Sequence, residues 1–288
     1  SNEMIKQAAA KASSNKQNAL EALKPGLLAA IIGLALAGCV LWFGMLDSAQ
    51  QQQHQALSRA WGESQATALQ QALKQLAADT QAAAQNPQLI EALQSADISQ
   101  IRAAERSLKY WNGVVDAQLN LRGQAVQDMG RTAPMNFAAL DLLRRVENGQ
   151  TPAVEAYKVG QQWLVYSVAP LRLSKDQPLQ GTLLLAFDLN RLLASLPPLP
   201  AQVGAIELSQ QFGTAAAQVL ARHGSAQGKA QQFDSGNPNW KLSFIPGPAL
   251  NGSAFSPLLL ALAGLLALLG AALGFYLVHR RFNNHLEG

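Results

Sequence analysis

Two long apolar runs lie near the two ends of the chain. They cover Leu27–Leu46 and Leu258–Val278, and neither contains a charged residue. At about 1.5 Å per residue, each run is long enough to cross the ~30 Å hydrocarbon core of a bilayer. An uncharged helix of this length is apolar on every face, which is typical of a membrane span. We therefore predict transmembrane helices over residues 25–47 and 255–278.

Basic residues next to these runs indicate the orientation. Four lysines and two glutamates precede the first run, and His279, Arg280 and Arg281 follow the second. Lys and Arg beside a span are retained in the cytoplasm, so we expect both termini to be cytoplasmic in a bacterial inner membrane. This topology predicts two cytoplasmic tails and one periplasmic segment, which are 1–24, 279–288 and 48–254.

The single cysteine, Cys39, excludes an intramolecular disulfide, so the outer segment must be held by its own core. Its setting, Leu36-Ala37-Gly38-Cys39, resembles the lipidation box of bacterial lipoproteins. A lipoprotein would continue with a polar tether, whereas here Val40-Leu41-Trp42-Phe43 continues the apolar run. The stretch before the run is also longer than an ordinary signal n-region. We favour an uncleaved signal-anchor helix.

Small residues recur in both predicted spans. Ala29, Gly33 and Ala37 are spaced by four, and Gly270 and Gly274 form a GxxxG motif. Such spacing lets helix backbones approach closely in lipid. We expect Gly33, Gly270 and Gly274 to pack either between the two spans or across a homodimer. The alternative is that they are ordinary background composition.

The first part of the outer segment, 48–112, is predicted to be helical. Residues 48–84 contain no proline, and apolar side chains recur at intervals of three, four or seven, which predicts one long amphipathic helix. Asn86-Pro87 breaks it. We expect a short helix over 88–94 and another that begins at an Asp97 or Ser99 cap.

The pattern changes to strands after Gly113. The expected elements of 113–200 are a hairpin with its turn at Asn120–Gly123, a helix, three strands and a short helix before a Pro-rich linker. Their predicted ranges are Val114–Leu119, Ala125–Met129, Asn136–Asn148, Ala153–Val159, Trp163–Leu173, Gly181–Asp188 and Leu189–Leu196.

Four further strand-like pieces follow in 201–254. They are Val203–Ser209, Gln218–Arg222, Lys229–Phe233 and Trp240–Ile245. This block is either a small second domain or an extension of the first sheet, and its length favours packing against the preceding domain. The predicted fold class is α+β, with two transmembrane helices flanking a periplasmic domain that has a long N-terminal helix and a mainly antiparallel sheet.

The order of these elements resembles the Cache family of extracytoplasmic sensors, which have a PAS-like fold. That family's first hairpin commonly turns at Asp-x-x-Gly, and here Asn120-Leu121-Arg122-Gly123 stands in that place. Gln162–Leu171 looks like the family's aromatic strand ending in Ala-Pro, and Gly181–Asp188 looks like its Gly-x-apolar successor. The resemblance covers roughly 48–196 and implies a sensory domain.

Two later segments, Gly204–Phe212 and Asn237–Phe244, resemble the membrane-anchored extension of long-form bacterial phosphomannomutase/phosphoglucomutase. The catalytic motifs of that enzyme, its phosphoserine loop and its metal-binding aspartates, are not in this sequence. This resemblance implies that the chain is the sensory half, with a catalytic part such as a phosphohexomutase expected beyond residue 288.

Candidate chemistry in the sequence is sparse. The four histidines are scattered without metal-ligand spacing, and no nucleophile elbow, Walker loop or dinucleotide motif is present. The segment 48–254 has 16 Lys and Arg against 14 Asp and Glu, so it shows no electrostatic footprint for nucleic acid. We expect no enzyme within these residues, no catalytic or metal site, no cofactor and no nucleic-acid partner.

A ligand pocket in a PAS-like domain would lie between the sheet and the helices over it. An arginine, either Arg144 or Arg145, could clamp a carboxylate there. Because side chains alternate along a strand, only one of Trp163 and Tyr166 can face a given pocket. The alternative for each residue is core packing or solvation. The candidate ligand-binding residues are Trp111, Arg144, Tyr157, Trp163, Tyr166 and Asp188.

Two functional hypotheses follow. In the first, a non-enzymatic sensory module relays a periplasmic signal through two transmembrane helices to a cytoplasmic output beyond residue 288 or in a partner. In the second, the domain is an inner-membrane scaffold or dimerisation module that binds a periplasmic protein. A cavity with convergent polar groups favours sensing, whereas a filled core with exposed apolar residues favours a scaffold. The expected partners are membrane lipid, a second copy, and an unknown periplasmic small molecule or protein.

Overall fold

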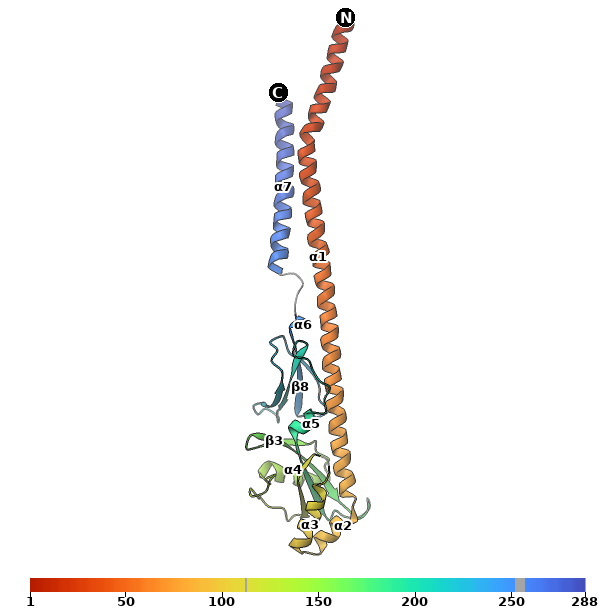
Figure 1. Cartoon of the computed structure of the whole chain (residues 1–288), viewed down its shortest axis with the longest axis vertical. Helices are drawn as coiled ribbons and strands as arrows, with labels where there is room; N and C mark the ends of the chain where they lie inside the picture. The colour runs from red at the N-terminus through yellow and green to blue at the C-terminus, as the bar shows by residue number, and fades with distance from the viewer. Residues whose placement is uncertain (112, 252–256, 288) are drawn as a thin grey trace. The chain divides into compact units, whose positions relative to one another are not determined.

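The computed structural model describes residues 1–111, 113–251 and 257–287 (Figure 1). The chain forms two compact units, one of Ser1–Gln55 with Gly252–Gly288 and one of Ala56–Asn251. A single helix, α1 (Asn2–Ala84), contributes to both units. Each unit is described by itself below.

Among the described residues, two stretches of helix are long and apolar enough to cross a membrane, Lys24–Ala84 within α1 and Ala261–Asn284 within α7 (Pro257–Glu287). The first stretch begins in the first unit and continues into the second, and the other belongs to the first unit. Large apolar side chains such as Leu34 and Leu268 are exposed on them, which an apolar surrounding would stabilise. The helical structure of α1 also continues through 1–24, where the sequence predicts a weakly helical or disordered tail.

The two helices of this unit lie side by side with small residues between them (Figure 1). A Cβ added at Gly33 would lie 3.1 Å from Cβ of Ala271, and one added at Gly274 would lie 2.6 Å from Cβ of Ala29. Gly33 and Gly274 therefore lie at the contact. Among the described residues outside its own helix, no atom lies within 4 Å of a Cβ added at Gly270, which points about 100° away from Ala271 around the helix. Gly270 therefore does not contact the other span in this chain, and its packing across a homodimer stays a prediction.

The second unit begins with three helices, the Ala56–Ala84 part of α1, α2 (Pro87–Gln94) and α3 (Ile98–Leu108). The side chain of Asn86 caps α2 by accepting a hydrogen bond from the N–H of Gln88 (3.1 Å), and Asp97 caps α3 through the N–H of Ser99 (2.9 Å). These caps satisfy N–H groups that a helix start leaves unpaired. The predicted helix break and the Asp97 cap are confirmed.

A four-stranded antiparallel sheet follows, in the order β1-β4-β3-β2. Its strands are β1 (Val114–Leu121), β2 (Glu155–Val159), β3 (Gln162–Leu171) and β4 (Gly181–Asp188). Alternation along the strands gives it two buried faces. One face, with Leu183 and Leu185, packs in the same core as α1, and the other, with Leu184, packs against α4 (Phe137–Glu147). Both faces are covered, which explains the nearly continuous burial of β4.

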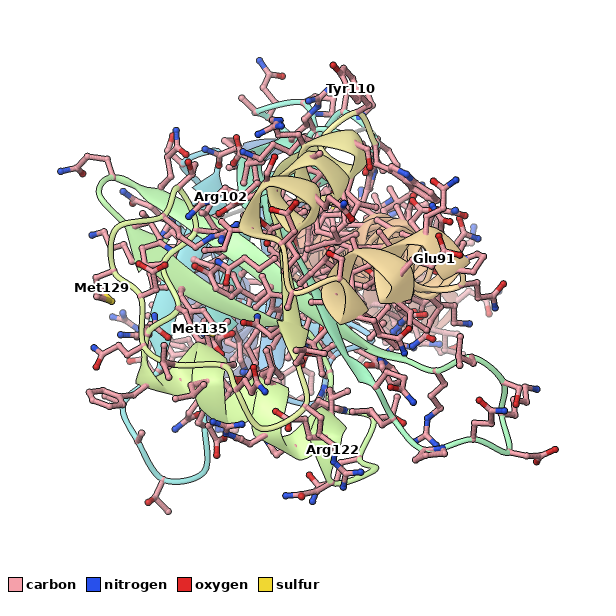
Figure 2. All side chains as sticks on the ribbon, turned by 90° about the horizontal axis from the view of Figure 1, so that it is seen from below. Glu91, Arg102, Tyr110, Arg122, Met129 and Met135 are labelled. Carbon is pink, nitrogen blue, oxygen red and sulfur yellow. The ribbon has the colours of Figure 1, made fainter. Side chains whose placement is uncertain are left out.

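The returning strand predicted over Ala125–Met129 does not form. The segment between β1 and α4 has one isolated bridge, between Asp128 and Met135. Figure 2 shows Met129 on the outer side of this segment, where it is 60% exposed, whereas Met135 is 2% exposed over the sheet.

Side chains occupy the outer edge of β1 in place of that strand. The N–H of Leu119 donates to Glu105 (2.9 Å), and the carbonyl of Ala117 accepts from Arg131 (2.9 Å). The N–H of Ala117 donates to the carboxylate of Asp116 (3.0 Å). Because these backbone groups are already paired, a returning strand has no partners there.

Residues 204–246 form a separate antiparallel sheet in the order β6-β5-β8-β7, not an extension of the first. Its strands are β5 (Gly204–Gln210), β6 (Gln218–His223), β7 (Gln231–Asp234) and β8 (Trp240–Pro246). Two short helices complete the unit, α5 (Leu189–Leu193) and α6 (Pro248–Asn251). The second sheet shares one core with α1 and the first sheet, and Phe233 lies over Gly62 of α1.

Side-chain amides join the two sheets. Gln210 of β5 accepts a hydrogen bond from the N–H of Ala156 (2.9 Å) and donates one to its carbonyl (2.8 Å), much as a neighbouring strand would. The indole N–H of Trp240 also donates to Gln210 (2.9 Å). Asn237 donates to the carbonyl of Val154 (2.8 Å). The edge strand β2 is therefore closed by the second sheet, which protects it from pairing with another chain.

The helix contact predicts different effects for two neighbouring glycines. Gly274→Ile should displace α7 from Ala29, whereas Gly270→Ile should be tolerated because nothing lies near it. A Cβ at Gly264 would lie 3.8 Å from Val40, so a disulfide between Val40→Cys and Gly264→Cys, in a Cys39→Ser background, reports the contact. We expect the cross-link yield to fall several-fold with Gly274→Ile only. Equal yields for the two isoleucine variants would contradict this packing.

The hydrogen bonds of Gln210 between the two sheets predict a large loss of stability in Gln210→Ala. This change leaves the buried N–H and C=O of Ala156 and the indole N–H of Trp240 unpaired, so the free energy of unfolding should fall by about 2–4 kcal/mol. The measurement is urea unfolding of the full chain in detergent, followed by tryptophan fluorescence. Gln232→Ala on the exposed side of β7 is the control and should change little. Similar losses of unfolding free energy in both variants would show that the hydrogen bonds of Gln210 do not stabilise the unit.

Candidate functional site

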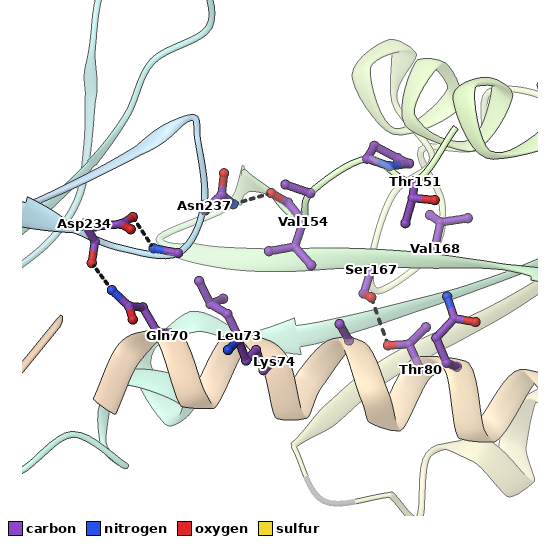
Figure 3. A pocket seen from close by; sticks show the side chains of 15 residues that line it. Gln70, Leu73, Lys74, Thr80, Thr151, Val154, Ser167, Val168, Asp234 and Asn237 are labelled. Atoms are coloured by element: carbon purple, nitrogen blue, oxygen red, sulfur yellow. Dashed lines mark hydrogen bonds between the residues drawn. The ribbon is translucent and has the colours of Figure 1, made fainter. Parts of the chain in front are cut away.

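A groove of about 410 Å³ lies where α1 meets both sheets (Figure 3). One wall is α1 between Gln70 and Gln81. The facing wall combines the segment 151–154, which precedes β2, with Ser167 and Val168 of β3. The third side is the turn between β7 and β8, with Asp234, Gly236 and Asn237. Its volume is in the range of small-molecule pockets.

Helical spacing places the α1 residues on one flank of the helix. Gln70, Leu73, Lys74, Ala77, Thr80 and Gln81 recur every three or four residues and therefore share a face. Figure 3 shows Gln70, Leu73 and Thr80 directed from α1 toward the strands. Leu73, Val154 and Val168 give the groove apolar surface, while the amide, hydroxyl and ammonium groups make it polar at other points.

The turn between β7 and β8 is tied to both other walls. The carbonyl of Asp234 accepts a hydrogen bond from Gln70 of α1 (2.8 Å), and Asn237 donates to Val154 (2.8 Å), as Figure 3 shows. Within the turn, the N–H of Gly236 donates to the carboxylate of Asp234 (2.9 Å). Gly236 has a φ of +85°, and a Cβ there would lie 3.0 Å from Cγ of Gln70. Glycine is therefore required both for this backbone conformation and for the approach of α1.

A buried hydroxyl pair joins α1 to the first sheet at the base of the groove. Thr80 lies within hydrogen-bonding distance of Ser167 (2.9 Å) and of the carbonyl of Leu76 (2.9 Å). Both hydroxyl side chains are buried in otherwise apolar surroundings. If the two side chains separated, a buried hydroxyl would lose its hydrogen-bond partner, which costs free energy. This contact therefore holds α1 in position over β3.

A second hollow, of about 300 Å³, lies on the opposite flank of the same helical segment. Ala72, Gln75, Leu76 and Asp79 of α1 form one side of it, and Phe187, Asp188 and residues of α5 form the other. Between the two hollows, the buried residues Leu69 and Leu73 pack α1 into the core. The helix therefore rests on a narrow apolar ridge with open space on either side.

The two tyrosines predicted to bind a ligand lie elsewhere, in the core between the first sheet and α4. Their rings meet edge to face at 4.8 Å, and their hydroxyls donate within the protein, Tyr157 to Glu155 (2.6 Å) and Tyr166 to the carbonyl of Pro134 (2.7 Å). Burial raises the pKa of both Tyr157 and Tyr166, so both are neutral donors. Aromatic core packing is their role in this structure.

The candidate arginines are paired with protein groups. Arg144 donates to Glu147 (3.0 Å) and to the carbonyl of Ala125 (2.8 Å), which ties down the segment between β1 and α4. Arg145 bonds to Glu155 (2.6 Å) and Asp141 (3.1 Å). Neither guanidinium lines the groove.

The remaining candidates are dispersed. Trp163 packs against the core shared with α1, on the opposite face from Tyr166, as strand alternation predicts. Trp111 is partly exposed after α3. Asp188 caps α5 by accepting from the N–H of Asn190 (3.0 Å) and lines the second hollow. The structure therefore does not bring the six predicted residues together into one site.

The sequence predicts a ligand between the sheet and the helices over it, and on the α4 side this space holds packed side chains, among them Tyr166, Leu142 and Leu143. At the outer edge of β1, an ionic cluster places Arg131 3.4 Å from Glu105 and 3.5 Å from Asp116. Asp116 also accepts a hydrogen bond from the N–H of Ala133 (3.0 Å). These carboxylates are satisfied within the protein, so the cluster stabilises the fold of the segment after β1.

Sequence reasoning missed the groove residues because they come from distant parts of the chain. A usable signal was nevertheless present. Thr80 and Ser167 are polar residues at positions where the surrounding pattern predicts burial, in an amphipathic helix and in the apolar strand Gln162–Leu171. Buried polar residues are informative because they require partners.

No family model and no curated protein matches the chain. Among solved structures, it is similar to the ligand-binding domain of the Campylobacter jejuni chemoreceptor Tlp3 in complex with 4-methylisoleucine, with 10% identity and a TM-score of 0.43. This match covers 69% of this chain and 96% of that one. The sensory domain of the same receptor with isoleucine bound matches with 10% identity and a TM-score of 0.41, over 68% of this chain and 96% of that one. Both neighbours are ligand-binding or sensory domains of that chemoreceptor.

Proposed function

We propose that this chain is a non-enzymatic, membrane-anchored sensory module whose outer unit binds a small molecule in the groove between α1 and the two sheets. The observation that carries the proposal is that this one groove touches all three structural parts of the unit at once. A ligand there contacts α1, the first sheet and the turn of the second sheet. Its binding energy would therefore depend on how α1 is seated against both sheets.

The helix that forms one wall of the groove also carries the first apolar run. A ligand shifts a conformational equilibrium only by its differential affinity for the two states. In this proposal, the ligand favours one position of α1 against the sheets, and the continuous helix transmits the displacement toward the membrane. The output would lie in a cytoplasmic partner or in further sequence.

The second hollow supports a movement of α1. Close-packed interiors resist displacement, so a sideways shift of α1 would need the open space that lies on its two flanks. Filling the groove would press α1 toward the side lined by Ala72 and Asp79. The Thr80–Ser167 hydrogen bond would have to rearrange in such a shift, which makes it a natural reporter of the two states.

A scaffold is the second candidate function, and a separate observation favours it. Three large apolar side chains are exposed between β1 and the start of α4, with Val126 at 70%, Met129 at 60% and Phe137 at 74%. Exposed apolar residues on a loop are typical of protein-binding surfaces. A periplasmic protein or a second copy would bind there without using the groove.

Blocking the groove tests the sensory proposal. Ala77→Trp places an indole in the groove, whereas Ala78→Trp, on the neighbouring exposed position outside it, is the matched control. We would screen amino acids, organic acids, amines, sugars and nucleosides against the full chain in lipid nanodiscs by thermal shift. Compounds that stabilise the unmodified chain and Ala78→Trp should fail to stabilise Ala77→Trp. Compounds that stabilise all three alike would place the ligand elsewhere and refute the groove as the sensory site.

A further inference from the structure

Hydrogen-bond acceptors around the groove are largely used by the protein itself. The carbonyl of Asp234 is taken by Gln70, that of Val154 by Asn237 and that of Leu76 by Thr80. One carboxylate oxygen of Asp234 accepts from the N–H of Gly236. The other stays available at the exposed rim of the groove. For a ligand that supplies only donors, the side-chain acceptors left are this oxygen and the oxygens of Gln81 and Thr151.

Donors remain available in the groove. Within the part of the chain that the structure describes, the ammonium of Lys74, the amide of Gln81 and the hydroxyl of Thr151 have no hydrogen-bond or ion-pair partner, and all three residues line the groove. Lys74 and Gln81 come from α1, and Thr151 comes from the segment before β2. A ligand with acceptor atoms would thus be held from two walls at once.

The charged side chains of the groove also favour a ligand with acceptor atoms. Lys74 is its cationic side chain, and Asp234, the acidic one, is already engaged in its own turn. An ammonium attracts a carboxylate more strongly in a half-enclosed groove than in bulk water, because the effective dielectric constant is lower there. Hydrogen bonds between ionised partners are also roughly twice as strong as neutral ones.

The remaining walls are apolar. Leu73, Ala77, Pro152, Val154 and Val168 surround the polar groups. An inorganic anion would leave this surface in contact with water, whereas a hydrocarbon body would cover it and gain the free energy of burying apolar surface. The groove therefore requires both an anionic end and an apolar body in one molecule.

Resting on the proposed sensory function, we infer that the groove binds a small organic carboxylate with an apolar body, whose carboxylate is held by Lys74 together with Gln81 and Thr151. The apolar body lies against Leu73 and Val154. Specificity for the carboxylate comes from Lys74, and the shape of the apolar walls selects among carboxylates.

The test compares carboxylates with their neutral and cationic counterparts. The probes are pentanoate, benzoate and phenylacetate, the corresponding amides, and pentylamine, titrated by calorimetry into the full chain in nanodiscs with empty nanodiscs as the blank. We expect at least one carboxylate to bind roughly tenfold or more tightly than its amide, because a hydrogen bond to a charged group is stronger than one to a neutral group. Pentylamine should bind more weakly still.

Two lysine variants assign the effect to the groove. Lys74→Met removes the charge and keeps the length of the side chain, and it should reduce carboxylate affinity to that of the amide. Lys158→Met, on β2 outside the groove, should leave it unchanged. Equal affinity of carboxylates and amides, or equal losses in both lysine variants, would overturn the carboxylate assignment.

The groove-filling variant separates this inference from the sensory proposal. If Ala77→Trp abolishes binding of amides or amines while carboxylates bind no better than these, the groove remains a ligand site and the carboxylate class is wrong. If Ala77→Trp binds the carboxylates as the unmodified chain does, the sensory proposal fails together with the inference. Absence of binding by all three carboxylates would also overturn the assignment.

Discussion

The fold of the second unit depends on burial of one stripe of α1. Leu69, Leu73 and Leu76 lie in a single core with side chains of both sheets, so the helix supplies the second layer that each sheet needs. A four-stranded sheet of this size has no stability without a partner for its apolar face. The position of α1 is therefore constrained by two sheets simultaneously, and every other feature of the unit is arranged around that contact.

Side chains complete the edges that the backbone leaves open. Gln210 pairs with both backbone groups of Ala156 and so closes the edge of β2, while Glu105 and Arg131 do the same for β1. In both places the side-chain groups are buried, so removing one exposes an unpaired backbone group to an apolar surrounding. The same chemistry both prevents strand addition at these edges and fixes the two sheets relative to each other.

The groove is a consequence of this arrangement. A cylindrical helix packed on two sheets through a narrow ridge leaves space on its flanks, and the turn at Asp234–Asn237 closes one of these spaces into a groove. Its walls belong to elements that must all keep their places for the core to form. A ligand bound there would act on the contact that holds the unit together, which is the physical reason for proposing the groove as the sensory site.

Elements with strong local signals could be predicted from the amino-acid sequence alone. Uncharged apolar runs, the Asn86-Pro87 break, the Asp97 cap and the strands around Tyr166 and Leu184 follow from periodicity and turn chemistry, which act over a few residues. The absence of a strand at Ala125–Met129 depends on tertiary contacts, because Glu105 and Arg131 reach the edge of β1 from outside the predicted hairpin. Tertiary structure likewise placed Tyr157 and Tyr166 in the core and brought Lys74, Thr151 and Asn237 to one groove. Such sites depend on contacts between side chains that are far apart in the sequence, and no local sequence pattern encodes these contacts.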